Sequence, residues 1–450
     1  MTFVFSTDIH SSILYSLPDN MRKNRVNVVT LGCSKNLVDS QKLMRQLEAG
    51  GYLVSSDSTN PADIVIINTC GFILDAKEES IETIIQHADA IKKRGHGSLF
   101  VMGCLSERYK DELKASLPEV DAWFGVNNPS EVISRLGLVY NPNLTGERKI
   151  TNPGHYAYLK IAEGCDRTCA FCAIPAIRGS YISAPIEELV AEAKYLASTG
   201  VKELILIAQD LSYYGIDIYG KQSLTLLVSE LSAVEGIEWI RLHYLYPSNF
   251  PMDLLDLMNS NTRICRYIDI PIQHISDSVL KNMRRAHGSG DTRRLLNEIR
   301  NKVPDAVIRT TVIAGHPDET TDDFNELLDF IKEFRFNRLG AFRYSHEEGT
   351  YGSRNYSDNI PEKTKEARVS AIMDLQQKIS SELNEAYIGT VMKVIVDRKE
   401  GAFYIGRSQF DSPEVDQEIL IRSYEKIEPG TFINVKITGS TEFDLFAEKL

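Results

Sequence analysis

The sequence has no long apolar run. None of its uninterrupted apolar stretches approaches the ~20 residues that a helix needs to cross a bilayer. The first twenty residues also lack the basic start and the small-residue cleavage site of a secretory signal, because Asp8, His10 and Asp19 interrupt their apolar residues. We therefore expect a cytoplasmic protein that is not associated with a membrane.

Cysteine is scarce, and the few cysteines present do not suggest disulfides. An odd number, seven, in a chain expected in a reducing compartment favours metal binding or catalysis over a disulfide framework. The cysteines are Cys33, Cys70, Cys104, Cys165, Cys169, Cys172 and Cys265.

Positive charge is also in short supply. The 50 Lys and Arg are outnumbered by 62 Asp and Glu, which gives a net charge of −12. Such a chain has no global attraction for nucleic acid, although a local basic patch is compatible with it. The sign fits a basic protein partner better. A length of 450 residues with 43% hydrophobic residues indicates two or three globular domains.

The first part of the chain predicts a parallel α/β domain at residues 25–145. Three short apolar runs are each followed by a helical pattern, which is typical of strands in a parallel sheet. The residues before position 25 show no period and predict a disordered extension, 1–24. A polar stretch at 141–154 with two Pro and two Gly predicts a linker. The three runs are Val26–Leu31, Ile64–Asn68 and Leu99–Met102.

The alternation of strand and helix resumes at residues 151–386, and a third pattern follows at 387–450. Six strand–helix units predict a partial (β/α)6 barrel of the TIM type, with active groups at the carboxyl ends of its strands. A helix at about 362–386 closes this domain. Short strands separated by turn residues then predict a small all-β barrel. The expected central strands are 158–162, 204–208, 239–245, 267–272, 307–313 and 339–344.

A cluster of three cysteines follows the first central strand. Cys165, Cys169 and Cys172 form a CxxxCxxC pattern. Soft thiolates select zinc or iron–sulfur clusters, and structural zinc takes four ligands where this segment offers three. The fourth cysteine of a ferredoxin run is also absent. Three thiolates on a four-iron cluster leave one iron open to chelate a small molecule.

The segment 164–181, GCDRTCAFCAIPAIRGSY, resembles the signature loop of the radical S-adenosylmethionine superfamily. The resemblance implies that the open iron binds S-adenosylmethionine, and that an electron from the [4Fe-4S] cluster cleaves it to a 5′-deoxyadenosyl radical. It also suggests cofactor contacts, for each of which ordinary packing or capping is an equal alternative. These candidates are Phe171, Gln209, Asp210, Arg309, Thr311 and Gly315.

The three cysteines of the first domain are far apart in sequence but share a position in the pattern. Cys33, Cys70 and Cys104 each follow an apolar strand, and parallel strands end at one edge of their sheet. We therefore expect the three thiols to converge and to hold a second, auxiliary [4Fe-4S] cluster. The alternative is three unrelated buried cysteines. Cys265 belongs to neither set, and we expect it to be structural.

From about Arg25 to Leu450 the chain resembles the methylthiotransferases. The resemblance implies an auxiliary-cluster domain, a radical domain and a C-terminal TRAM domain. It also implies use of two S-adenosylmethionine molecules, a sulfur donor and an electron donor. Stretches such as TLGCSKNLVDS and the Gln273–His274 pair look like the branch that modifies the β-carbon of an aspartate in small-subunit ribosomal protein S12. His274 as an ordinary buried histidine, a transfer-RNA adenosine methylthiotransferase and a non-catalytic electron-transfer protein remain alternatives.

The C-terminal segment is acidic, with eleven Asp and Glu against eight Lys and Arg from Tyr387 onward. A module that grips phosphates is expected to be basic, so transfer RNA is the less favoured substrate. Four carboxylates lie within one turn-rich segment and predict an exposed surface that docks a basic protein, with a merely solvated loop as the alternative. They are Asp411, Glu414, Asp416 and Glu418.

Overall fold

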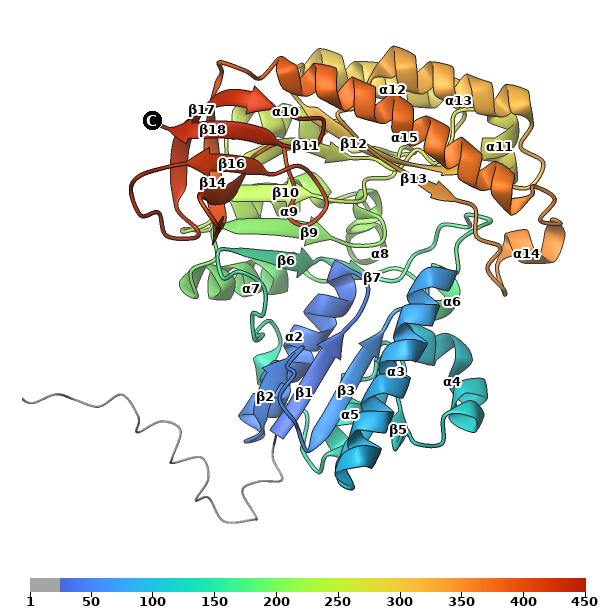
Figure 1. The fold of residues 1–450 in the computed structure, drawn as a ribbon, viewed down its shortest axis with the longest axis vertical. Coiled ribbons are helices and arrows are strands. Elements are labelled where there is room, and N and C mark those ends of the chain that lie inside the picture. Colours follow the sequence, from blue (N-terminus) through green and yellow to red (C-terminus); the bar gives the residue numbers. More distant parts are fainter. Residues whose placement is uncertain (1–24) are drawn as a thin grey trace, which may run out of the picture. The chain divides into compact units, whose positions relative to one another are not determined.

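The computed structural model describes residues 25–450, and the extension predicted at 1–24 lies outside the described residues. The chain divides into two units between Lys149 and Ile150, each described by itself below (Figure 1). In the described part of the chain, no helix is both long and apolar enough to cross a membrane.

The first unit is a five-stranded parallel sheet with helices on both faces. Its strand order is β2-β1-β3-β4-β5. Alternate strand residues face opposite sides, so Val28 and Ile66 pack with Leu43 of one helix while Ile67 and Val101 pack on the other side. The strands are β1 (Arg25–Thr30), β2 (Leu53–Ser56), β3 (Ile64–Thr69), β4 (Ser98–Gly103) and β5 (Ala122–Trp123); the helices are α2 (Ser34–Ala49), α3 (Leu74–Arg94), α4 (Cys104–Ser116) and α5 (Pro129–Arg135).

The central part of the second unit is an open six-stranded parallel sheet, as predicted. The strand order β13-β12-β11-β10-β9-β6 follows the chain without a crossover, which is the arrangement of a partial (β/α) barrel. The strands are β6 (Tyr156–Lys160), β9 (Glu203–Ile207), β10 (Trp239–Leu242), β11 (Ile264–Asp269), β12 (Val307–Ala314) and β13 (Arg338–Arg343). The helices of eight or more residues around them are α7 (Ile186–Ser198), α9 (Leu224–Ser232), α10 (Asp253–Ser260), α12 (Ser289–Lys302), α13 (Thr321–Phe334) and α15 (Glu362–Glu385).

The two faces of this sheet differ sharply in chemistry. Residues such as Leu204, Leu206 and Ile240 belong to the apolar core shared with the helices. The alternate residues include Glu203, Arg241 and Tyr267, and these buried polar side chains contact the C-terminal barrel. Cys265 lies on this second face, fully buried beside Trp239, and has a structural setting as expected.

The C-terminal domain is a closed five-stranded barrel, also as predicted (Figure 1, red strands). Its core includes Val394, Ile419, Val435 and Leu445. Its strands are β14 (Val391–Glu400), β15 (Phe403–Ser408), β16 (Ile419–Arg422), β17 (Phe432–Ser440) and β18 (Leu445–Lys449). The prediction missed β2 and β5 of the first unit, because β2 carries two serines in four residues and β5 has only two residues.

The prediction of an exposed acidic docking surface at 411–418 is wrong for Asp411 and Asp416, whereas Glu414 is exposed and the Glu418 side chain is 37% exposed. The side chains of Asp411 and Asp416 are only 1% exposed. Asp411 pairs with Arg338 at 2.6 Å, and Asp416 lies 3.5 Å from the Arg309 guanidinium. Tyr156 and Tyr158 donate hydroxyl hydrogen bonds to Glu414 at 3.0 and 3.4 Å. These contacts attach the acidic segment to the polar face of the six-stranded sheet.

A second ionic cluster joins the same two domains. Arg241 and Arg407 both pair with the fully buried Glu203, at 2.8 and 2.9 Å. Arg407 also pairs with Asp397 at 2.7 Å, and Asp397 lies 2.7 Å from His155. Burial alone would raise the pKa of Asp397, but Arg407 and His155 hold that pKa below its usual value. Removal of one partner from a buried pair costs about 3–5 kcal/mol, so these contacts fix the barrel against the sheet.

Candidate functional sites

The loop that carries Cys165, Cys169 and Cys172 is held at both ends by backbone contacts. It leaves the two-residue strand β7 (Ala162–Glu163) and returns through β8 (Ile182–Ser183). Gly164 has φ +74°, and a Cβ there would lie 2.0 Å from the Ser180 carbonyl oxygen, so only glycine fits. The Ala170 N–H donates to the Met283 carbonyl at 2.9 Å. The sequence thereby presents its three thiols from a rigid loop.

The three thiols are buried or partly buried, and an arginine side chain contacts one of them. The Arg167 N–H donates to Cys165 Sγ at 3.4 Å, and Arg285 Nη1 donates to Cys169 Sγ at 3.4 Å. Burial raises the pKa of Cys165 to about 11 and, with the neighbouring Cys169 as a further cause, raises the pKa of Cys172 to about 12. These thiols therefore hold their protons at neutral pH until a metal displaces them.

The donor set fits an iron–sulfur cluster better than a single ion. Among residues 25–450, no three His, Cys, Asp or Glu side chains are arranged to hold one metal ion. On a four-iron cluster each thiolate binds a different iron, so the three sulfurs need not surround one point. Thiolates are the ligands that such clusters take, and three of them leave one iron open. The N–H donors and the two guanidinium groups suit the negative charge of a thiolate-bound cluster.

Three of the six predicted cofactor contacts have well-defined partners within the protein. Asp210 accepts from Arg167 at 2.8 Å and from the Ser212 N–H at 2.8 Å. Arg309 pairs with Asp269 at 3.1 Å as well as with Asp416. The Gly315 N–H donates to Glu319 at 2.6 Å. As cofactor ligands, these three residues stay predictions.

The other three candidates have fewer contacts. Phe171 lies half-buried between two of the cysteines. Gln209 follows β9, and its Oε1 is buried without a hydrogen-bond partner among the described residues. Thr311, on β12, accepts from the Gln273 N–H through its carbonyl at 2.9 Å. Gln273 itself has φ +70° and a buried, unpartnered Oε1 within the described part of the chain. Gln209 and Gln273 thus offer carbonyl oxygens that a ligand's N–H groups can use.

Tyr246 and Arg285 lie beside Cys169, and His287 contacts Arg285; none of the three was predicted from the sequence. The Tyr246 hydroxyl lies 4.0 Å from Cys169 Sγ, and the guanidinium groups of Arg167 and Arg285 lie 4.1 and 4.0 Å from the centre of the Tyr246 ring. His287 accepts from Arg285 Nε at 3.3 Å. The one sequence feature that could have pointed to Arg285 is the pair of adjacent arginines at 284–285, which follows a short helix.

His274 is an internal residue in this structure. It is fully buried, and its Nδ1 accepts from the Ser276 N–H at 3.0 Å, while its Nε2 is buried without a partner among the described residues. Burial lowers the pKa of His274 to about 3. A neutral histidine with these contacts fits the alternative of an ordinary buried histidine.

The second set of cysteines lies at one edge of the first sheet, at the ends of three neighbouring strands. Cys33 follows β1, Cys70 follows β3 and Cys104 follows β4. A Cβ on Gly32, where φ is +88°, would lie 2.6 Å from Cys70 Cβ and 2.8 Å from its Sγ. The backbone before Cys33 therefore passes directly against Cys70, as the strand pattern predicted.

The Asn36 amide contacts the second set of cysteines, whereas the Arg285 guanidinium contacts the first set. The Cys104 thiol lies 3.8 Å from Asn36 Oδ1, and Asn36 Nδ2 donates to the carbonyl groups of Leu31 and Thr69. Cys33 is exposed, whereas Cys70 and Cys104 are buried. Three thiols, one of them open to solvent, fit a cluster with an accessible iron.

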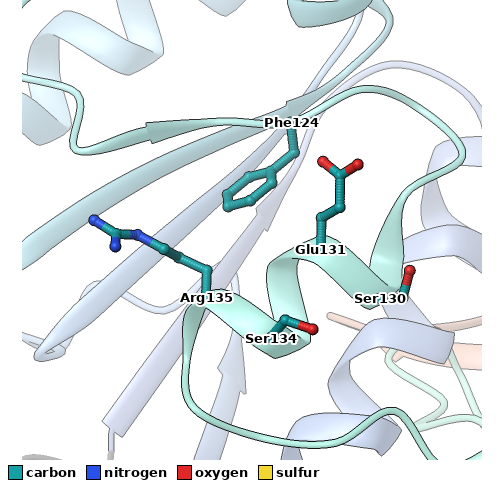
Figure 2. Close-up of a pocket in the computed structure, with 5 residues that line it drawn as sticks. All are labelled: Phe124, Ser130, Glu131, Ser134 and Arg135. Carbon is teal, nitrogen blue, oxygen red and sulfur yellow. The ribbon is translucent and has the colours of Figure 1, made fainter.

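An open cavity elsewhere in the first unit is unrelated to either cysteine set. It has a volume of about 490 Å³ and lies between β5 and α5 (Figure 2). Figure 2 shows Glu131 and Arg135 on one helix beside Phe124. None of the predicted site residues lines it. Its lining residues are Phe124, Ser130, Glu131, Ser134 and Arg135.

Comparison with known proteins covers nearly the whole chain. A protein named ribosomal protein uS12 methylthiotransferase RimO, from Bacteroides thetaiotaomicron, is 52% identical over 432 residues, 96% of this chain and 99% of that protein. The protein of the same name from Flavobacterium johnsoniae is also 52% identical, over 95% of this chain and 99% of that protein. The chain belongs to the uS12 methylthiotransferase family. The resemblance predicted from the residues is confirmed.

Three family models match successive parts of the chain. An uncharacterized protein family, UPF0004, matches residues 25–125, the radical SAM superfamily matches 159–331 and the TRAM domain matches 388–449. The radical SAM match implies a [4Fe-4S] cluster and S-adenosylmethionine as cofactors.

Solved structures confirm the fold. A radical S-adenosylmethionine methyltransferase, TsrM, from Kitasatospora setae aligns with a TM-score of 0.52 at 15% identity, over 71% of this chain and 72% of that one. A cobalamin-dependent S-adenosylmethionine radical enzyme, OxsB, aligns with a TM-score of 0.51 at 13% identity, over 74% of this chain and 55% of that one.

Proposed function

We propose that this chain attaches a methylthio group to the β-carbon of an aspartate in ribosomal protein uS12. The reaction would use two S-adenosylmethionine molecules, a sulfur donor and an electron donor, and would take place in the cytoplasm. The identity of 52% along almost the full length of named uS12 methylthiotransferases carries the proposal.

Two three-thiol sites support this chemistry. Cys165, Cys169 and Cys172 would hold one cluster, and Cys33, Cys70 and Cys104 would hold a second. When bound, the first cluster supplies the electron that cleaves S-adenosylmethionine, and the second supplies the sulfur that is transferred. We keep the predicted division into an auxiliary-cluster domain (25–145), a radical domain (151–386) and a TRAM domain (387–450).

The chain's own residues orient the reactants. The loop after β7 fixes three thiols, and the Arg167 backbone N–H and the Arg285 guanidinium donate hydrogen bonds to two of them. Gln209 and Gln273 present carbonyl oxygens that can bind N–H groups of the cofactor or of the substrate peptide. The 411–416 segment packs against the sheet through the buried Asp411 and Asp416, which pair with Arg338 and Arg309.

The test is mass spectrometry of ribosomal proteins and transfer RNA from cells with and without this gene. The proposal expects a methylthio group on one uS12 aspartate that disappears with the gene, while transfer RNA is unchanged. Loss of a methylthio group from transfer-RNA adenosine, with uS12 unchanged, would identify the other branch of the family instead.

A further inference from the structure

Arg285 occupies an unusual position beside the radical-site thiols. Its guanidinium group is half-buried, and its Nη1 donates to Cys169 Sγ at 3.4 Å. The same group lies over the Tyr246 ring, whose hydroxyl is 4.0 Å from that sulfur. A charged donor therefore faces one predicted cluster ligand directly.

Every nitrogen of this guanidinium has a fixed partner. Nη2 donates to the Pro271 carbonyl at 2.8 Å, and Nε donates to His287 Nε2 at 3.3 Å. His287 Nδ1 lies 2.9 Å from Thr292 Oγ1, which in turn donates to the Gly288 carbonyl at 3.0 Å. Because burial lowers the pKa of His287 to about 3, its ring is neutral and free to accept from Arg285. This chain of hydrogen bonds directs Nη1 at the sulfur.

The nearby Arg167 differs in one decisive respect. Its charge is balanced by Asp210, at 2.8 Å and almost fully buried. Arg285 takes part in none of the ion pairs with carboxylates found among residues 25–450. Its three hydrogen-bond acceptors are a sulfur, a carbonyl and a neutral imidazole. Asp210, which pairs with Arg167, acts on Arg285 only at longer range, so the anion in direct contact with Arg285 would be the thiolate-bound group at Cys169.

We propose that Arg285 is a positioning residue that raises the reduction potential of the cluster held by Cys165, Cys169 and Cys172. This inference rests on the proposed function, since it requires a cluster at that site. Reduction adds one electron to the cluster, supplied by a low-potential one-electron donor. A fixed positive charge and an N–H bond to a ligand sulfur stabilise the reduced, more negative state.

The experiment is a potentiometric measurement on the reconstituted full-length protein, followed by electron paramagnetic resonance. Wild type is compared with Arg285→Gln, which removes the charge, and with Arg284→Gln as the matched control. Arg284 is the adjacent arginine, but it is exposed and stacks on Tyr351 at 4.2 Å. The auxiliary cluster of the same protein serves as an internal reference.

The proposal expects at least a tenfold fall in the ratio of reduced to oxidised radical-site cluster at a fixed potential in Arg285→Gln. For a one-electron couple this corresponds to a downward shift of about 59 mV. Arg284→Gln and the auxiliary cluster should not shift. Arg285→Lys keeps the positive charge but loses the planar guanidinium and its three directed N–H bonds. Its reduction potential should shift in the same direction by a smaller amount. If Arg285→Gln binds less iron than wild type, the lysine variant carries the comparison.

An unchanged potential in both Arg285 variants, with full iron content, overturns the proposal. An unchanged potential together with weaker binding of S-adenosylmethionine would instead make Arg285 a ligand of that molecule. Either result leaves the proposed function intact if wild type still modifies uS12. Failure of the proposed function would show differently, as a wild-type protein without a cluster at this site or without a methylthiolated product.

Discussion

The two cysteine sets present three thiols each, but different groups contact those thiols. In the second unit, Cys165, Cys169 and Cys172 lie in a loop lined by Arg167 and Arg285. In the first unit, the cysteines lie at strand ends, and the uncharged Asn36 amide contacts Cys104.

This difference matches the two roles in the proposed reaction. A site that must accept an electron benefits from nearby positive charge, because the reduced state is the more negative one. A site that delivers sulfur needs access instead, and Cys33 of the first unit is exposed. In the proposed reaction, the same number of ligands would serve two purposes because the groups around the ligands differ.

Removal of either set should have the largest effect. Changing Cys165, Cys169 and Cys172 to Ala should halve the iron of the reconstituted protein and abolish cleavage of S-adenosylmethionine. Changing Cys33, Cys70 and Cys104 to Ala should also halve the iron but leave cleavage measurable. Iron analysis and detection of 5′-deoxyadenosine check this. Full iron content in either triple variant would show that the assignment of that set is wrong.

A substitution at Gly32 should remove the auxiliary iron without unfolding the first unit. Gly32→Ala would place a methyl group 2.8 Å from Cys70 Sγ at a residue with φ +88°, so the auxiliary iron should be largely lost. Gly51→Ala is the control, since its φ is +90° but nothing lies within 4 Å of the new Cβ. The control should lose only about 1 kcal/mol of stability and keep its iron. Equal iron loss in both variants would point to backbone strain alone.

The buried acidic segment should stabilise the second unit without docking a partner. Asp416→Asn leaves Arg309 paired with Asp269 alone, and because burial already raises the pKa of Asp416, we expect a loss of about 1–3 kcal/mol in unfolding free energy. Glu418→Gln, at a side chain 37% exposed and paired with Arg398, should lose less than about 1 kcal/mol. Denaturant unfolding followed by circular dichroism measures both. Similar losses would mean that the ionic contacts with the sheet contribute little.

Acid should weaken the second unit through its buried neutral histidines. His274 keeps its pKa near 3 in the fold, whereas the unfolded chain takes up a proton below about pH 6.5. Stability is therefore lost as the pH falls from about 6.5 toward 3, and the loss from His274 is about 2 kcal/mol at pH 5. His274→Gln should show a smaller loss between about pH 7 and pH 5 in the iron-free protein, while His96→Gln, an exposed control, should behave like wild type. Denaturant unfolding at the two pH values measures this, and equal losses in wild type and His274→Gln would contradict it.

Much of the fold was predictable, because local patterns mark both sheets. Short apolar runs followed by helical periods indicated the six strands of the central domain, and turn residues marked the strands of the small barrel. The CxxxCxxC spacing and the position of Cys33, Cys70 and Cys104 after strands were visible in the same way. These signals depend only on neighbouring residues.

Contacts between distant residues were not predictable. The segment around Asp416 has the composition of a solvated acidic loop, since its partner Arg309 is far away in sequence and only the fold brings them together. The same holds for Arg285, which reaches Cys169 across 116 residues. Charge counted along the chain predicted a surface, whereas the fold pairs most of that charge internally.

Mössbauer spectroscopy of the reconstituted wild-type protein tests the central claim most directly. If the two thiol sets each hold a cluster in different surroundings, the spectra should account for two [4Fe-4S] clusters per chain, and partial reduction should convert one of them before the other. A single [4Fe-4S] cluster per chain at full reconstitution, or two clusters that reduce together, would contradict the account.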